Sequence, residues 1–419
     1  MLNVVEAFSG IGSQTQALKN AKIEHTVSAI IEWDVGAMYA YDILHNGPQD
    51  LKDYRHHTKS SLIDKLSEFN ISTDGKSKVS KKGLSRMSTL QLKSIYVAIE
   101  RNNNLVDISS VMANDLPENV DILTYSFPCQ DLSIGSNWHN NFSGIDKGID
   151  NRSGLLWQVE RLLKDYCNIN KKPPKFLLME NVSAIESKLH NKNFQLWQSF
   201  LEELGYINQV YTLNAKNFGI PQNRERTYMI SILVNEDDKK REAIQSFFFN
   251  NNLENLYVEE KSIYPIENYL KLDYSNIVYK NEAIESTPNY TPSREKIYES
   301  NKILAIDSTI KKHAIANTIT TKQDRHPNSG IIEYKDINLV DGAKYRNLTP
   351  RECFLLMGFN EEAYDTLLRN NIFITKKRKM LSFSKLYILS GNSIVVPVLE
   401  EIFKQIYTIN EKILKNDRI

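Results

Sequence analysis

Short apolar runs alternate with stretches of helical spacing over the first 235 residues of the chain. This alternation predicts an α/β fold, in which crossover helices join the strands of a doubly wound, mostly parallel sheet. The runs are rich in β-branched and aromatic residues, which favours strands. The expected strands are Asn3 to Phe8, Thr26 to Glu32, Val120 to Phe127, Phe176 to Met179, Ile207 to Leu213 and Thr227 to Leu233.

A long polar segment, at about residues 46–104, separates the second expected strand from the third. Its middle, GKSKVSKKGLSRMS, has the composition of a loop, whereas STLQLKSIYVAIERN has helical spacing. We therefore interpret the segment as an insertion that carries at least one helix.

The periodicity weakens after about Asn235, but Tyr, Ile and Leu keep recurring, which favours a second, smaller domain over a disordered tail. RNLTPRECFLLMGF predicts a helix with Thr349 as its N-cap and Pro350 in its first turn. The last apolar stretch, LYILSGNSIVVPVLEEIFKQIY, predicts a strand, a glycine turn and a terminal amphipathic helix.

The composition is that of an ordinary globular protein, with 419 residues of which 41% are hydrophobic and 25% charged. No run of about 18 apolar residues predicts a membrane span, and we expect a cytoplasmic protein. The net charge of +1 does not by itself indicate a nucleic-acid partner. Short basic runs fit either phosphate contacts or solvated loops, and these are Lys376 to Lys379, Lys311 with Lys312, and Lys81 with Lys82.

The three cysteines, Cys129, Cys167 and Cys353, are widely separated and have no metal-binding spacing. We expect neither a disulfide nor a metal site. Cys129 follows Pro128 at the end of an expected strand, where open α/β folds hold their ligands, so its position suits a nucleophile. A small buried thiol is the alternative interpretation. The next strand ends in Glu180, and the strand after that one leads to FGIPQNRERTYMI, which carries two arginines. We expect the thiol, the carboxyl and the guanidinium groups to meet in one crevice.

A glycine turn opens the chain, in VVEAFSGIGSQTQALKNA, between an expected strand and a helical stretch. Gly10 and Gly12 let a ligand approach the backbone and leave the amino end of the helix facing it. The second strand ends in Glu32 and Trp33. The Glu32 carboxylate could accept hydrogen bonds from ribose hydroxyls, and the Trp33 ring could stack on a purine. Trp33 fits core packing equally well.

Several further motifs follow in a fixed order: SFPCQDLS, MENV, QNRER, RNLTPRECFLLMGF and GNSIVVPV. With AFSGIG, EW and VDI before them, the chain resembles the bacterial DNA (cytosine-5) methyltransferases over nearly its whole length. The resemblance implies a Rossmann-like catalytic domain of residues 1–236 and 384–419, and a target-recognition domain of residues 237–383. It also implies double-stranded DNA as substrate, S-adenosyl-L-methionine as methyl donor and S-adenosyl-L-homocysteine as product.

The implied reaction requires a cytosine flipped out of the duplex. Its carbon 5 is too weak a nucleophile until the thiolate of Cys129 adds to carbon 6. Glu180 would act at ring nitrogen 3 and Arg226 at the carbonyl oxygen, with Arg224 and Gln222 in support.

The resemblance also implies two sets of binding residues. The first set would bind the cofactor. Asp107 is its least certain member, because the family often has Gly where this chain has Val106, and Asp115 and Asp121 lie nearby. The implied cofactor residues are Phe8, Gly10, Gly12, Glu32, Trp33, Asp107, Ile108, Pro128 and Asn392. The implied DNA contacts are Gln130, Ser133 and Arg152 in a loop after the nucleophile, and Thr318, Thr320, Gln323 and Arg325 in the recognition domain.

Other interpretations stay open at this point. An RNA (tRNA) cytosine-5 methyltransferase would share the architecture, although that branch typically has a second proline where this chain has Phe127. A catalytically inactive DNA-binding regulator would be free to lose Cys129 or Glu180. We expect a monomer, either paired functionally with a cognate restriction endonuclease or acting as an orphan. The long insertion is compatible with added DNA contacts and with added stabilising contacts.

Overall fold

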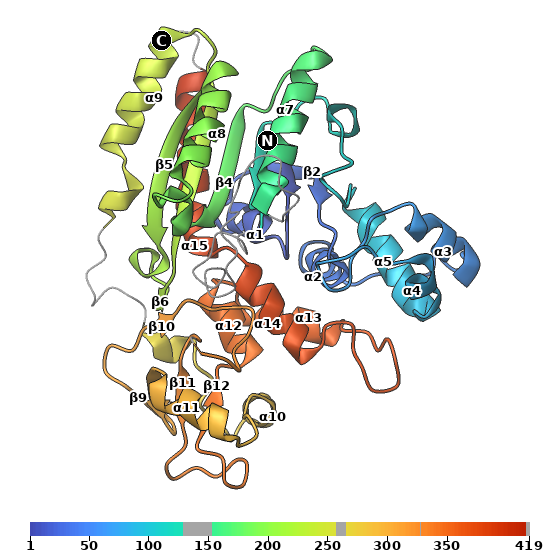
Figure 1. Cartoon of the computed structure of the whole chain (residues 1–419), viewed down its shortest axis with the longest axis vertical. Helices are drawn as coiled ribbons and strands as arrows, with labels where there is room; N and C mark the ends of the chain where they lie inside the picture. Colours follow the sequence, from blue (N-terminus) through green and yellow to red (C-terminus); the bar gives the residue numbers. More distant parts are fainter. Residues whose placement is uncertain (129–152, 257–264, 327, 416–419) are drawn as a thin grey trace.

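The computed structural model describes residues 1–128, 153–256, 265–326 and 328–415. A six-stranded sheet in the order β2-β1-β3-β4-β7-β5 forms its centre (Figure 1). All strands are parallel except β7, which is antiparallel to both β4 and β5. The strands are β1 (Leu2–Ala7), β2 (His25–Ile31), β3 (Ile122–Tyr125), β4 (Phe176–Val182), β5 (Tyr206–Asn214) and β7 (Glu225–Leu233). The predicted fold class and all six predicted strands are confirmed.

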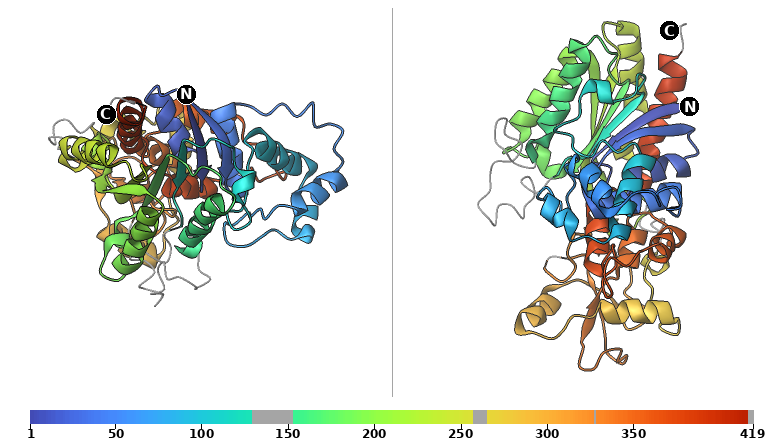
Figure 2. Two further views of the ribbon diagram at one scale, coloured as in Figure 1. Left: turned by 90° about the horizontal axis from the view of Figure 1, so that it is seen from above. Right: turned by 90° about the vertical axis from the view of Figure 1, so that its right-hand side faces the viewer.

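Helices cover both faces of this sheet (Figure 2). Because side chains alternate along a strand, Val4 of β1 joins the core on one face while Val5 joins the core on the other. The first face is covered by α1 (Ser13–Asn20), α2 (Val35–Asn46) and α15 (Val396–Ile409), and the second by α7 (Leu156–Asn168) and α8 (Asn191–Glu203). The arrangement is doubly wound, as predicted.

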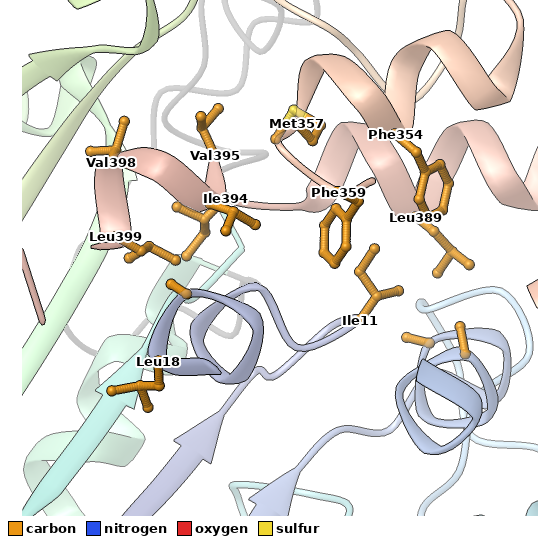
Figure 3. Packing of buried hydrophobic residues seen from close by; sticks show 14 of the residues in the cluster. Ile11, Leu18, Phe354, Met357, Phe359, Leu389, Ile394, Val395, Val398 and Leu399 are labelled. Atoms are coloured by element: carbon orange, nitrogen blue, oxygen red, sulfur yellow. The ribbon is translucent and has the colours of Figure 1, made fainter. Parts of the chain in front are cut away.

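The C-terminal motifs form helices that pack on the glycine turn. Helix α12 (Pro350–Leu356) begins at Thr349, whose hydroxyl accepts from the amide of Glu352, as predicted. The predicted strand LYIL is wrong, because it lies in α14 (Phe383–Asn392), which packs against α12. Figure 3 shows residues of α12, α14 and α15 gathered over Ile11 and Leu18.

The stretch Phe383–Leu414 is long and apolar enough to cross a membrane, judged by length and composition alone. Within it, α14 and α15 are separate helices with Ser393, Ile394 and Val395 between them. Most of the stretch is buried inside the protein, which is the behaviour of core helices.

The insertion folds into a lobe beside α2 (Figure 1). It contains α3 (Lys59–Ser67), α4 (Lys81–Ser85) and α5 (Thr89–Arg101), which confirms the prediction of at least one helix. Helix α5 packs against both α2 and α3 through buried residues such as Leu92 and Ile95. The short α4 lies within GKSKVSKKGLSRMS, whose composition predicted a loop.

The smaller domain holds a four-stranded sheet in the order β12-β11-β8-β9. A short parallel pair, β6 with β10, joins it to the catalytic domain. Its elements and the connecting pair are β6 (Gln222–Asn223), α10 (Ile277–Glu285), α11 (Pro292–Ser300), β8 (Ile303–Ile306), β9 (Thr309–Ile310), β10 (Ala316–Asn317), β11 (Ile331–Glu333) and β12 (Tyr345–Asn347).

Two helices within residues 237–383, the predicted recognition domain, contact elements of the predicted catalytic domain. Helix α9 (Asp238–Asn250) packs against the catalytic sheet, where the ring of Phe248 lies 6.2 Å from that of Tyr211 in β5 (Figure 1). Helix α13 (Glu361–Arg369) packs against α2. The first and last helices of the predicted recognition domain therefore pack on the catalytic domain.

Candidate active site

Two of the predicted catalytic residues, Glu180 and Arg226, lie at the carboxyl end of the parallel strands of the central sheet. The carboxyl ends of β1, β2, β3 and β4 meet there, and because β7 is antiparallel, its first residues reach the same edge. Glu180 lies in β4 and Arg226 lies opposite Val182 at the start of β7. The nucleophile candidate Cys129 lies outside the described residues, as do Gln130, Ser133 and Arg152. Pro128, three residues after the end of β3, is described.

Glu180 and Arg226 form an ion pair, with Arg226 Nε 3.4 Å from Glu180 Oε1. The two side chains are only 12% and 16% exposed, so water screens the pair weakly. Burial raises the pKa of the Glu180 carboxyl above its usual value, and Arg226 and then Arg224 oppose that shift. A carboxyl of this kind can hold or share a proton closer to neutral pH than an exposed glutamate.

Asn181 was not predicted as a site residue, but it joins the end of β4 to the segment that follows β3. Its side-chain amide is buried and donates to the carbonyl oxygen of Phe127 at 3.0 Å. Asn181 therefore fixes the backbone at Phe127, which stands two residues before Cys129 in the sequence. The sequence offered one signal for this role, because Asn181 directly follows Glu180 in MENV.

Gln222 and Arg224 hold the recognition domain and the C-terminal motif together. The Gln222 amide accepts from the amide of Ile319 at 2.9 Å and donates to the carbonyl of Leu356 at 2.8 Å. Arg224 donates to the carbonyls of Ile319 at 2.9 Å and Ser393 at 2.8 Å. Both side chains are buried, so they position the neighbouring backbone.

The glycine turn has the backbone that a ligand site requires. Phe8, Gly10 and Gly12 all have positive φ, at 57°, 57° and 79°. A Cβ atom on Gly10 would meet nothing within 4 Å, so open space borders the backbone there. A Cβ atom on Gly12 would lie 2.2 Å from Nε2 of His45, so only glycine fits. Gly12 caps α1 without a side-chain hydrogen bond, which leaves amides of the first turn available.

Glu32 lies beside this turn with hydrogen-bonding capacity to spare. One carboxylate oxygen accepts from the amide of Gly10 at 2.9 Å and the other from the amide of Asp34 at 2.8 Å. Because a carboxylate has about four lone-pair positions, two remain for ribose hydroxyls. Burial, and then repulsion by Asp34, raises the pKa of Glu32 to about 7. Trp33 is half-buried next to it, so these residues fit a nucleoside.

The second carboxylate of the predicted cofactor site is Asp107, and the two nearby alternatives, Asp115 and Asp121, make contacts of their own. Asp115 accepts from the amide of Met112 in a short 3-10 turn. Asp121 pairs with Lys175 at 2.6 Å and accepts from the amide of Asn3. Ile108 is buried, and Asn392 is exposed at the last residue of α14.

The predicted recognition residues lie on the segment after β10 and differ in accessibility. Thr318 donates to the carbonyl of Asn223 at 2.8 Å, and Thr320 to that of Lys322 at 2.7 Å. Gln323 is only 1% exposed, and its amide is bonded to Thr320 and Ser329. This arrangement corrects the expectation that Gln323 reads a base, because it stabilises the loop. Arg325 is exposed.

Comparisons with known proteins show the family of the chain. The family described as C-5 cytosine-specific DNA methylase matches residues 84–408. The Type II methyltransferase M2.ScrFI of Lactococcus lactis subsp. cremoris is 35% identical over 414 residues, which cover 97% of this chain and 99% of that protein. The Orphan methyltransferase M.SssI of Spiroplasma monobiae is 33% identical over 97% of each chain.

A solved structure shows the same fold at lower identity. The crystal structure of the S. pombe Dnmt2 methyltransferase has a TM-score of 0.57 to this chain at 18% identity, and covers 97% of this chain and 98% of its own. The matched family, the two full-length relatives and the convergence of Glu180 with Arg226 beside the end of β3 lead to one assignment: the chain belongs to the C-5 cytosine-specific DNA methylase family.

Proposed function

We propose that Cys129 and Glu180 carry out the family's reaction, methylation of cytosine carbon 5 in DNA, on a base flipped out of the duplex. The observation that supports their roles best is the buried Glu180–Arg226 pair at the strand edge next to Pro128, with the pKa of Glu180 raised by burial. S-adenosylmethionine supplies the methyl group as a sulfonium electrophile.

The Cys129 thiolate forms a bond to carbon 6 of the cytosine, and the ring electrons move toward carbon 5 and nitrogen 3. The Glu180 carboxyl shares its proton with nitrogen 3, which relieves the developing charge. Carbon 5, made nucleophilic in this way, would take the methyl group from a bound cofactor, which would leave as S-adenosylhomocysteine. Loss of the carbon 5 proton to water and cleavage of the bond to Cys129 restore the aromatic ring and the free thiol.

Arg226 fixes the carboxyl and donates to the cytosine carbonyl oxygen, since its Nε already faces Glu180. Arg224 and Gln222 keep Ile319 and Ser393 in place around this pair. Thr318 and Thr320 shape the recognition loop, and exposed Arg325 is the proposed contact to a base or phosphate.

The direct test of this function is methyl transfer by the purified enzyme from methyl-labelled S-adenosylmethionine. Duplex DNA and an RNA of matching sequence are offered separately. We expect label in DNA alone, at carbon 5 of cytosine. Label in RNA alone would overturn the proposal in favour of the RNA methyltransferase.

The cofactor site predicts a pH-dependent affinity. Ionised Glu32 accepts from Gly10, Asp34 and the ribose, whereas the protonated form loses acceptor capacity. Since the pKa of Glu32 is about 7, affinity for S-adenosylhomocysteine should be full only well above pH 7 and should fall as the pH drops through 7, approaching about tenfold per pH unit well below the pKa. Calorimetry from pH 5.5 to 8.5 measures this dependence, and Glu32→Gln should bind weakly without it.

A basic hairpin is a second proposed DNA contact. Residues 370–382 carry three Lys and one Arg and no Asp or Glu. The buried Asn371 side chain bonds the amide and carbonyl of Leu381, at 2.9 and 2.7 Å, and fixes the base of the hairpin. Lys376 to Lys379 are all exposed, next to the 57% exposed ring of Phe373.

Replacing Lys376 to Lys379 by alanine should therefore weaken DNA binding and flatten its salt dependence, by about 0.9 in log–log slope for each phosphate that the variant no longer neutralises. Fluorescence anisotropy over a range of salt concentrations measures the slope. Lys81→Ala is the matched control, because Lys81 already pairs with Asp64 at 2.7 Å. An unchanged slope in the hairpin variant would show that the hairpin is only a solvated loop.

The proposed enzyme acts as a cytoplasmic monomer on chromosomal DNA. A cognate restriction endonuclease is its proposed functional partner, by analogy with the relative named a type II methyltransferase. The relative named an orphan methyltransferase supports the second candidate, an enzyme without such a partner.

A further inference from the structure

The loop between α3 and α4 pairs with the backbone just after β2, at Trp33 and Asp34. The amide of Ser72 donates to the carbonyl of Trp33 at 2.7 Å, and the amide of Val35 donates to the carbonyl of Ser72 at 2.8 Å. Ser72 and Asp34 thus form a parallel bridge, and Ser72 is fully buried. The insertion therefore fixes the turn that carries Trp33.

The end of the insertion holds the other side of the same site. The buried Asn104 side chain accepts from the amide of Glu32 at 3.0 Å and donates to the carbonyl of Glu32 at 2.9 Å. It also accepts from the amide of Val106 at 2.9 Å. Val106 has a φ of 64°, which a β-branched residue rarely adopts. The amide of Asp107 donates to the carbonyl of Leu105 at 2.8 Å, which closes a three-residue turn around Val106. A strained turn thus places Asp107.

The Asp107 carboxylate receives its own bond from the insertion. The Asn70 amide donates to Asp107 Oδ2 at 2.7 Å, while the amide of Ser109 donates to Oδ1 at 2.9 Å. One donor on each oxygen fixes the plane of the carboxylate and leaves lone pairs for a further donor. The exocyclic amino group of adenine is a donor of the right kind.

We propose that the insertion completes the adenine end of the cofactor site, with Asn70 as the positioning residue for Asp107. This inference rests on the proposed cofactor roles of Asp107 and Trp33. It assigns the lobe of α3, α4 and α5 a function in cofactor selection, in addition to packing on α2 (Figure 1).

Calorimetric binding of two probes tests the inference: S-adenosylhomocysteine and S-inosylhomocysteine, whose purine carries an oxygen in place of the amino group. We expect the wild type to prefer the adenosyl probe. Asn70→Ala should raise the Kd for the adenosyl probe about tenfold and reduce this preference, because the carboxylate is no longer held. Asn70→Asp should bind more weakly still, since it places a second carboxylate against Asp107.

The matched control is Thr73→Ala, an exposed position in the same loop, which should bind both probes like the wild type. Thermal unfolding of each variant, and an unchanged Kd for duplex DNA, show that the fold is retained. If Asn70→Ala binds the adenosyl probe with wild-type affinity and preference, the inference is wrong while the proposed function stands. If the wild type binds neither probe, the proposed cofactor site itself fails.

Discussion

Replacing Cys129 by alanine is expected to abolish methyl transfer, with a loss on the order of 10⁴-fold or more, because carbon 5 cannot attack without prior addition at carbon 6. Binding of DNA and of S-adenosylhomocysteine should persist, since the thiol forms its bond only with the flipped cytosine. Single-turnover transfer of labelled methyl groups to duplex DNA measures the loss.

The control for this variant is Cys167→Ala, which removes an exposed free thiol near the end of α7 and should leave the rate unchanged. Substantial transfer by Cys129→Ala, for example a tenth of the wild-type rate, would mean that another group activates the ring. Equal losses in both cysteine variants would indicate an effect on folding instead.

Replacing Glu180 by glutamine should lower kcat by about 10²- to 10⁴-fold, with a smaller effect on KM. Glutamine keeps the shape of the side chain and can donate to nitrogen 3, but it cannot share a proton with the ring. It also leaves Arg226 without its 3.4 Å ionic partner. Burial raises the pKa of Glu180, so the wild-type rate should fall as the pH rises through that pKa and the carboxyl loses its proton.

The pH profile separates this role from a purely structural one. Glu180→Gln should lack the decline in rate on the alkaline side, because it has no proton to lose there. Glu203→Gln, at an exposed position at the end of α8, should keep the wild-type rate and profile. If Glu180→Gln keeps both as well, Glu180 is a bystander and the proton reaches nitrogen 3 from elsewhere.

The strands of the central sheet and the position of Glu180 at the end of one of them could be predicted because local patterns encode them. The buried run before Glu180 and the glycine turn at Gly10 are visible in a few neighbouring residues. The run LYIL was misassigned because four apolar residues fit a strand and a buried helix equally well, and only packing against α12 decides between them.

Roles that depend on distant partners could not be predicted in this way. Asparagine is usually exposed, yet the side chains of Asn70, Asn104 and Asn181 each bond a residue that is remote in the sequence. Gln323 has the chemistry of a base reader, but its burial follows from the fold of the loop up to Ser329. The packing of α9 on β5 is likewise a long-range contact.

Bisulfite sequencing of DNA from cells that express the wild type or Cys129→Ala tests methylation by Cys129 most directly. The proposed mechanism predicts protected cytosines within one short motif in the wild-type sample, and none above background in the variant. Protected cytosines in both samples would contradict the role of Cys129. The absence of protection in both, with soluble protein present, would contradict DNA cytosine methylation itself.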